Sequence, residues 1–264
     1  MIIILAVLFS SLVQSQSLDF YLGDKKVTSL SIKQLEKIAK SEKISLSYHG
    51  AKSKIKNYRA FKLKKILSNV LGTFNDDDFS EVILEATDGY KAFSETSTLL
   101  IDGGYIAFKD LDVKEGWEPV GRGGIDPGPF YMVWKNKGQT SAEGYPWPWN
   151  LKKIRFVNFK TRYPTIYPQN KRKTSSIFKG FQVFKSSCFK CHALNKVGGK
   201  IGPDLGAPQN ILDYRSEKFV KAYIKNPEAF RYSKMPAHDH LSKQEVNDIV
   251  NFLKYHKAKK YFPL

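Results

Sequence analysis

The pentapeptide Cys188-Phe189-Lys190-Cys191-His192 constrains this chain more than any other feature, because it holds the only two cysteines among 264 residues. A C-x-x-C pair serves as a disulfide, as half of a zinc site, as a thiol redox pair or, when histidine follows directly, as the attachment site of c-type haem. A disulfide across two residues closes a loop too small to constrain the unfolded chain much. In haem attachment, both thiols bond to the porphyrin and the histidine ligates the iron.

The rest of the sequence argues against zinc and against thiol exchange. A structural zinc site needs a second pair of ligands at close spacing. The remaining histidines do not form such a pair: they are His49, His238, His240 and His256. A thioredoxin-like pair begins a helix after a strand, whereas the approach SSIFKGFQVFKSS, from Ser175, has a helical pattern of its own. We therefore interpret Cys188 and Cys191 as tethers of one covalent haem c and His192 as a ligand to its iron.

A second axial ligand has to come from elsewhere in the chain. The methionines are Met1, Met132 and Met235. Met235 stands in the polar segment RYSKMPAHDHLS, 43 residues after His192. A methionine in a polar loop is poorly suited to filling gaps in a core. We predict that Met235 is the second iron ligand, with His238 or His240 as the alternative.

The N-terminal stretch MIIILAVLFSSLVQS is an uncharged apolar run followed by small and polar residues. It is too short to span a bilayer and has the pattern of a secretory signal over residues 1–15, with cleavage after Ser15. No Lys or Arg precedes the run, since the first positive charge is Lys25, so either the true start lies upstream or the signal is atypical. A buried N-terminal strand is the alternative. The signal predicts a periplasmic or otherwise exported protein.

The formal charge of +18 is spread along the whole chain. Such a balance would suit nucleic acid, but export argues against that partner. We expect no nucleic acid and instead a redox partner protein with an acidic surface, or an anionic membrane surface.

The segment TRYPTIYPQNKRKTSS combines prolines, a basic run and serines, as linkers do. We therefore predict a domain at 16–160, a linker at 161–176 and a second domain at 177–264. The first domain mixes strand and helix patterns, and the second reads as helical. The predicted fold class is an α+β domain followed by an all-α domain.

Local patterns predict particular elements in both domains. The spacing of Ser31 and Gln34, and of Ser242 and Glu245, is that of a capping box at a helix start. The other expected elements are a strand over 44–49, a helix over 61–72 that stops at Gly72, two strands around Asp88-Gly89 within 81–93, strands in YIAFKDL, PFYMVW and KKIRFVNF, a helix over 216–225, and a helix from Ser176 to the cysteines.

Residues 177–257 resemble the class I cytochromes c through five motifs in order. The motifs are GFQVF at 180–184, CFKCH at 188–192, GGKIGPDL at 198–205, KMPAH at 234–238 and LSKQEVNDIVNFLKYH at 241–256. The resemblance implies a cytochrome c domain with one covalent haem c and with His192 and Met235 on the iron. It also implies that the Pro203 carbonyl accepts a hydrogen bond from His192, and that Gly180 and Phe184 pack against the Phe252 side of the last helix.

The first domain is similar to a truncated molybdopterin-binding domain of the sulfite-oxidase type, through NYRAFKLKKILSNVLG, ATDGYKAFSETSTLL and YIAFKDL…GPFYMVW within 25–159. Those enzymes hold molybdenum with a cysteine thiolate, and this segment contains no cysteine. We therefore expect the scaffold without molybdenum and without molybdopterin.

The leading hypothesis is an exported c-type cytochrome that carries electrons, with an N-terminal domain that binds a partner or ligand. The alternatives are an electron-transfer subunit of a periplasmic oxidoreductase complex whose N-terminal domain binds substrate, and a haem-based sensor in which Met235 leaves the iron. We expect an electron-transfer protein more than a catalyst. Lysines flank the haem motifs and are expected to surround the exposed haem edge: Lys185, Lys190, Lys196, Lys200 and Lys234.

Overall fold

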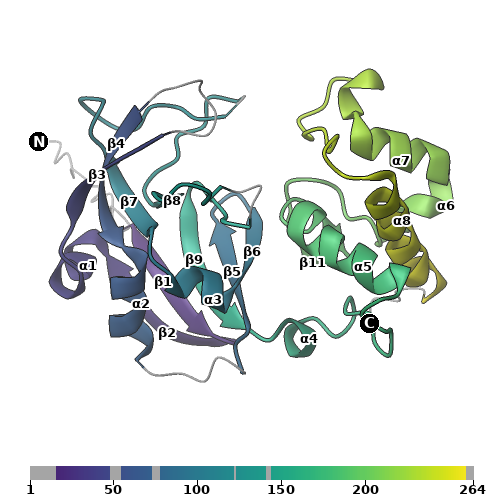
Figure 1. The fold of residues 1–264 in the computed structure, drawn as a ribbon, viewed down its shortest axis with the longest axis horizontal. Helices are drawn as coiled ribbons and strands as arrows, with labels where there is room; N and C mark the ends of the chain where they lie inside the picture. The colour runs from purple at the N-terminus through teal and green to yellow at the C-terminus, as the bar shows by residue number, and fades with distance from the viewer. Residues whose placement is uncertain (1–15, 48–54, 73–77, 122, 141–143, 260–264) are drawn as a thin grey trace, which may run out of the picture.

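The computed structural model describes residues 16–47, 55–72, 78–121, 123–140 and 144–259. The N-terminal domain, built mainly of strands, lies beside a C-terminal domain built mainly of helices (Figure 1). The predicted signal at 1–15 and its cleavage after Ser15 lie outside the described residues.

Two sheets form the N-terminal domain, with strand orders β2-β1-β9-β5-β6 and β3-β4-β7-β8. The strands are β1 Ser17–Leu22, β2 Lys25–Ser31, β3 Glu42–Ser47, β4 Ile55–Lys62, β5 Glu81–Ala86, β6 Lys91–Glu95, β7 Gly104–Asp110, β8 Tyr131–Trp134 and β9 Leu151–Val157. The helices are α1 Ile32–Ile38, α2 Leu63–Leu71 and α3 Thr96–Leu100. This confirms a mixed, sheet-rich α+β class for the N-terminal region.

Strand β9 joins the beginning and end of the N-terminal domain. It pairs in parallel with β1, with Asp19 opposite Lys153, and antiparallel with β5, with Ile83 opposite Arg155. Because parallel strands need a long connection, this pairing encloses the intervening elements. Apolar side chains of the strands and helices fill the space between, among them the fully buried Phe20.

Local sequence fixes the ends of several elements as predicted. The Ser31 and Gln34 side chains form the capping box of α1, and α2 stops at Gly72, whose φ is 61°. Strands β5 and β6 form a hairpin around Gly89 (φ 91°), where the Asp88 Oδ1 accepts a hydrogen bond of 2.9 Å from the backbone N–H of Tyr90. A positive φ at this turn favours glycine.

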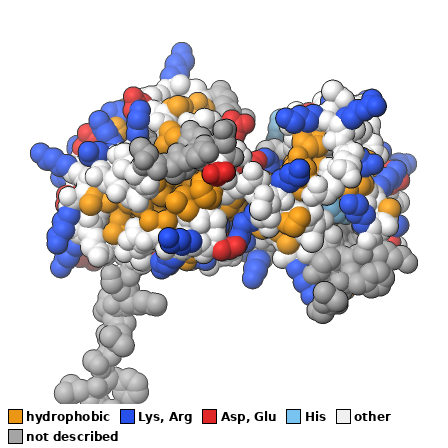
Figure 2. Space-filling model, turned by 90° about the horizontal axis from the view of Figure 1, so that it is seen from below, with side chains coloured by type: hydrophobic (Ala, Val, Ile, Leu, Met, Phe, Trp, Pro, Cys, Tyr) orange, Lys and Arg blue, Asp and Glu red, His pale blue; other side chains and the backbone are white. Residues whose placement is uncertain are grey.

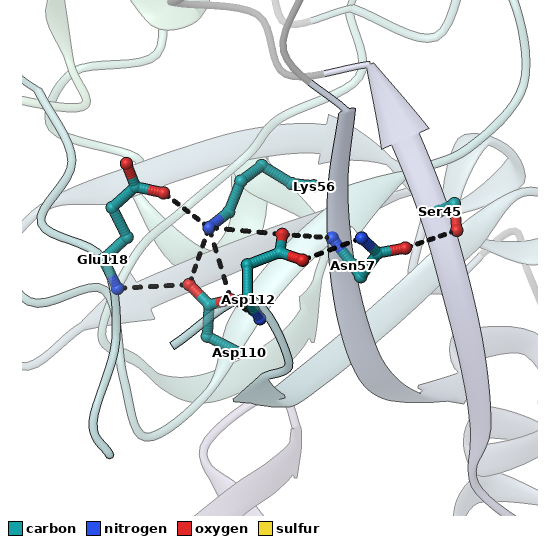
Figure 3. A network of polar contacts seen from close by, with 6 residues as sticks. All are labelled: Ser45, Lys56, Asn57, Asp110, Asp112 and Glu118. Carbon is teal, nitrogen blue, oxygen red and sulfur yellow. Dashed lines mark hydrogen bonds and ion pairs between the residues drawn. The ribbon is translucent and has the colours of Figure 1, made fainter. Parts of the chain in front are cut away.

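A buried lysine ties the loop after β7 to β4 (Figure 3). The ammonium of Lys56, a residue only 3 % exposed, lies 2.9 Å from Asp110, 2.6 Å from Glu118 and 3.5 Å from Asp112. Burial alone would lower the pKa of Lys56, but its hydrogen bonds to Glu118 and Asp110 outweigh burial and raise it. The position at the centre of these carboxylates is therefore filled by the protein's own cation.

Helices dominate the C-terminal domain. They are α5 Ser176–Val183, the π-helical turn η2 Phe184–Cys188, α6 Ile211–Tyr214, α7 Glu217–Lys225, the 3₁₀ turn η3 Pro227–Ala229 and α8 Lys243–Ala258. The predicted starts at Ser176 and at the Ser242 capping box are confirmed. The expectation of an all-α domain holds only in part, because β10 Ala193–Leu194 and β11 Val197–Gly198 form a small hairpin. Its two turn residues, Asn195 and Lys196, have φ of 54° and 67°, as a two-residue turn with the strand's twist requires.

Helices α5 and α8 cross at a glycine. A Cβ at Gly180 would overlap the carbonyl of Asp248, so only glycine allows the two backbones to approach this closely. Phe184 and Phe252 pack next to the crossing, with ring centroids 5.3 Å apart. The expected packing of Gly180 and Phe184 on the Phe252 side is therefore confirmed.

The segment between the domains packs onto the C-terminal domain. It begins with α4 Phe159–Arg162, and Ile166 is 1 % exposed within the C-terminal core. The His256 Nε2 of α8 lies 3.2 Å from the Ile166 carbonyl. The linker boundaries at 161–176 stay a prediction.

Lys and Arg side chains project from both domains on the face shown in Figure 2. The positive charge is therefore spread over that face, as the sequence indicated. None of the helices among the described residues combines the length and apolarity needed to cross a membrane.

Candidate functional site

The C-x-x-C-H motif, residues 188–192, begins at the last residue of η2 and continues as a turn, the attachment turn. The π-helical turn closes with a 2.8 Å bond from the Phe189 N–H to the Phe184 carbonyl. The Cys188 carbonyl then accepts from the N–H groups of Cys191, at 3.1 Å, and His192, at 2.9 Å. One turn of chain therefore presents two thiols and an imidazole, and single π-helical turns of this kind are frequent at functional sites.

Both cysteines are free thiols in the structure, and Cys188 is 8 % exposed. Burial raises the pKa of Cys188 to about 12 and also raises the pKa of Cys191. A thiol redox pair needs the opposite, a lowered pKa in a positively charged and accessible setting. The environment therefore opposes thiol exchange.

His192 is held by its own loop in one orientation. Its Nδ1–H donates to the Pro203 carbonyl at 2.8 Å, which leaves Nε2 with a free lone pair for a metal. Gly202 lies flat against the ring, since a Cβ there would be 2.5 Å from Cε1 of His192. The structure thus brings Cys188, Cys191, His192 and Pro203 together.

Asp204, a residue with no role predicted from the sequence, fixes the loop that carries the Pro203 carbonyl. Its carboxylate accepts four backbone N–H bonds, from Asn195 at 3.1 Å, Lys196 at 2.6 Å, Gly206 at 2.8 Å and Ala207 at 3.0 Å. The sequence feature that could have pointed to Asp204 is its position directly after Pro203. Asp204 ties the proline loop to the β10–β11 turn and so holds the acceptor of His192 in place.

Met235 comes from a separate loop, between η3 and α8, where its N–H donates to the Ser233 hydroxyl at 3.1 Å. Three residues later, His238 is buried with its Nδ1 unpartnered. Burial is the main cause that lowers the pKa of His238 to about 4, and Lys190 and His192 lower it further.

The donor set matches haem c. Two thiols in a C-x-x-C-H turn, an imidazole with a free Nε2 and a thioether from the loop before α8 are the groups that a covalent, six-coordinate haem requires. Among the described residues, no group of three or more His, Cys, Asp or Glu side chains is gathered so that it could hold a metal ion by itself.

One of the lysines expected around the haem edge has a different role. Lys185 forms an ion pair with Glu81 of β5 and lies 5.4 Å from the centroid of the Phe159 ring. It therefore faces the N-terminal domain. Lys200 and Lys234 are exposed.

Comparison with known proteins supports part of this assignment. Residues 177–257 match the family model for cytochrome c. The C-terminal domain is thus a cytochrome c domain, with haem c binding and an electron-carrying role. No curated protein matches the chain. The matched residues do not reach the N-terminal domain, whose similarity to a molybdopterin-binding domain stays a prediction.

Proposed function

We propose that the protein is an exported cytochrome that carries electrons through one covalent haem c, held by Cys188 and Cys191 and ligated by His192 and Met235. The observation that carries the proposal is the attachment turn, in which the imidazole is oriented by Pro203 at 2.8 Å and keeps Nε2 free. Haem iron supplies a one-electron ferric–ferrous couple.

The protein's own residues would keep that couple fast and selective. Two covalent tethers and two ligands would leave the site little to reorganise between oxidation states. The Pro203 carbonyl strengthens His192 as a donor through its hydrogen bond. A methionine as the second ligand raises the potential relative to a second histidine.

The test is purification of the full chain from a host that matures c-type haem. We expect a c-type absorption spectrum, one iron per chain and no molybdenum, with the spectrum surviving acid–acetone extraction because the tethers are covalent. A chain purified without haem would overturn the proposal. More than one iron would overturn the single-haem assignment.

Methionine substitutions test the second ligand. Met235→Leu should remove the sulfur-to-iron charge-transfer band and lower the midpoint potential. Met132→Leu is the matched control, because Met132 is fully buried in the N-terminal core and a volume-conserving change there should leave the spectrum intact. Ready carbon monoxide binding by the unchanged protein would instead support a haem-based sensor.

The partner is proposed to be an acidic protein. Exposed lysines beside the haem motifs, such as Lys200 and Lys234, support this assignment. Association driven by opposite charges slows as salt rises. We expect electron transfer to an acidic acceptor protein to slow steeply between low and physiological ionic strength, and a salt-independent rate would contradict this partner class. Sedimentation with anionic vesicles would indicate the membrane surface instead.

A further inference from the structure

The β5–β6 hairpin of the N-terminal domain contacts the attachment turn, residues 188–192. Strand β6 is at the edge of its sheet, so within the described part of the chain no strand pairs with one side of its backbone. On that side the Lys91 N–H donates to the Lys190 carbonyl at 2.9 Å. The contact satisfies a backbone group that a sheet edge would otherwise leave open.

The same hairpin also holds the segment that leads to Pro203. The Gly89 carbonyl at its turn accepts from the Lys200 N–H at 3.2 Å. A Cβ at Gly89 would lie 3.1 Å from the Cβ of Lys200, so the two segments touch. Lys190 precedes His192 by two residues, and Lys200 precedes Pro203 by three. The hairpin therefore contacts both segments whose mutual hydrogen bond orients the iron ligand.

Side chains add to these backbone contacts between the hairpin and the C-terminal domain. Phe93 of β6 packs against the C-terminal core, and its ring centroid lies 4.9 Å from that of Phe189, which directly follows the first cysteine. Glu81 of β5 forms the ion pair with Lys185 just before the cysteines. In Figure 1, β5 and β6 are on the side of the N-terminal domain that faces the C-terminal domain.

We propose that the β5–β6 hairpin positions His192 against Pro203 and thereby sets the reduction potential of the haem. The proposal rests on the proposed function, because it requires a haem on His192. The N-terminal domain would then act as a built-in positioning element for the ligand. Residues Gly89, Lys91 and Phe93 are positioning residues, since they act through the attachment turn.

The consequence for the potential follows from the hydrogen bond. A donated Nδ1–H makes the imidazole more basic and stabilises ferric iron. Loosening the hairpin would lengthen the bond to Pro203, weaken that donation and raise the potential. We expect a threefold to tenfold shift of the ferric–ferrous equilibrium, about 30–60 mV at about 59 mV per tenfold change for one electron.

The test compares three variants of the full holoprotein. Phe93→Ala should raise the midpoint potential and speed hydrogen exchange of the His192 Nδ1–H. Phe93→Leu keeps an apolar side chain against Phe189, so its potential and exchange rate should stay close to those of the unchanged protein. Phe108→Ala is the matched control: Phe108 is also half-buried and packs 4.5 Å from Phe61 inside the N-terminal domain. It should lower the stability of that domain and leave the potential unchanged.

Each result decides the proposal. If Phe93→Ala does not fold, Gly89→Val tests the same contact at the turn, because valine both meets Lys200 and strains a turn whose φ is 91°, and the potential should again rise. An unchanged or lowered potential in a variant that keeps its haem and its methionine band would overturn the positioning role and leave the proposed function standing. An unchanged protein that binds no haem would overturn both.

Discussion

Gly202 shows how a single missing methyl group serves the site. Its Cα lies so close to the His192 ring that an added Cβ would be 2.5 Å from Cε1 and 2.9 Å from Nε2. Nε2, the nitrogen with the free lone pair, thus lies directly beside the position that a side chain at residue 202 would occupy. Glycine at this position leaves the ring free to settle against Pro203.

We predict that Gly202→Ala displaces the His192 ring. The ring has to shift because a contact below 3.0 Å is not tolerated, and overpacking costs about 1–3 kcal/mol of the free energy of unfolding. We expect a changed Soret spectrum, a shifted potential and increased carbon monoxide binding. Gly123→Ala is the control, since among the described residues the Cβ there would meet just the Ile125 side chain, at 3.7 Å. An unaltered spectrum in Gly202→Ala would show that the ring does not need this space.

Lys56 has a structural role of similar specificity. Its side chain neutralises Asp110, whose own side chain is 1 % exposed. Removing one partner of a buried ion pair leaves an uncompensated charge. We predict that Lys56→Met lowers the free energy of unfolding by about 3–5 kcal/mol in urea denaturation.

The control for Lys56 is an exposed lysine of the same domain. Lys64→Met removes a side chain that is 59 % exposed and 4.0 Å from Asp102, and it should cost less than about 0.5 kcal/mol. The double variant Lys56→Met/Asp110→Leu should recover part of the loss. If Lys56→Met were as stable as the control, the network would not be holding the β7 loop to β4.

At the scale of elements, short sequence patterns correctly predicted the helix ends that are set by interactions between nearby residues. The capping boxes at Ser31 and Ser242 and the stop at Gly72 involve residues at most three positions apart, so the sequence displays them directly. The π-helical turn at 184–188 departs from the regular helix expected there. It depends on how the cysteine turn packs, and propensity carries no signal for that.

The crossing of α5 and α8 gives a further prediction. An alanine at Gly180 meets backbone atoms of Asp248 and Ile249, which cannot rotate away as a side chain can. The helices would have to separate and open the core around Phe252. We expect Gly180→Ala to lower the free energy of unfolding by about 3 kcal/mol, at the upper end of overpacking costs, as measured by denaturant titration of the holoprotein.

Lys179→Ala provides the comparison for this helix. Lys179 is the exposed neighbour of Gly180 on α5. Alanine favours the helix there and removes no buried contact, so stability should change little. Equal stabilities of the two variants would mean that the helices can part without cost.

Over the whole molecule, contacts between distant segments were the part that the sequence could not supply. The attachment turn was readable because its chemistry lies in five consecutive residues. Two contacts join segments about 100 or more residues apart: β1 pairs with β9, and the β5–β6 hairpin binds the Lys190 carbonyl. Backbone groups make these contacts, so no residue type marks them. The same holds for Glu81 and Lys185, two charges with no pattern to link them.

The segment between the domains makes folding stability depend on pH. His256 is 2 % exposed, with its Nε2 against the Ile166 carbonyl and its Nδ1 unpartnered. Burial is the main cause that lowers the pKa of His256 to about 4 from its ordinary 6.5, while the bond to Ile166 acts in the other direction. Folding therefore keeps this imidazole neutral, and Nε2–H donates to the carbonyl.

The sign of the effect follows from proton uptake. Below pH 6.5 the unfolded chain binds a proton at His256 that the folded chain does not bind until about pH 4. The free energy of unfolding should thus be highest above pH 6.5 and fall through that window by up to about 3 kcal/mol, at about 1.4 kcal/mol per pH unit. In His256→Gln, urea titrations between pH 7 and 4 should show a shallower fall, because glutamine takes up no proton.

The comparison with a second histidine separates this effect from general acid sensitivity. His240→Gln changes a side chain that is 65 % exposed, and it should retain the steep fall of the unchanged protein. His238 contributes in the same window, so the informative quantity is the difference between wild type and His256→Gln. Identical profiles for those two would mean that the unfolded and folded chains bind the His256 proton equally, and that burial beneath the segment between the domains does not keep the imidazole neutral.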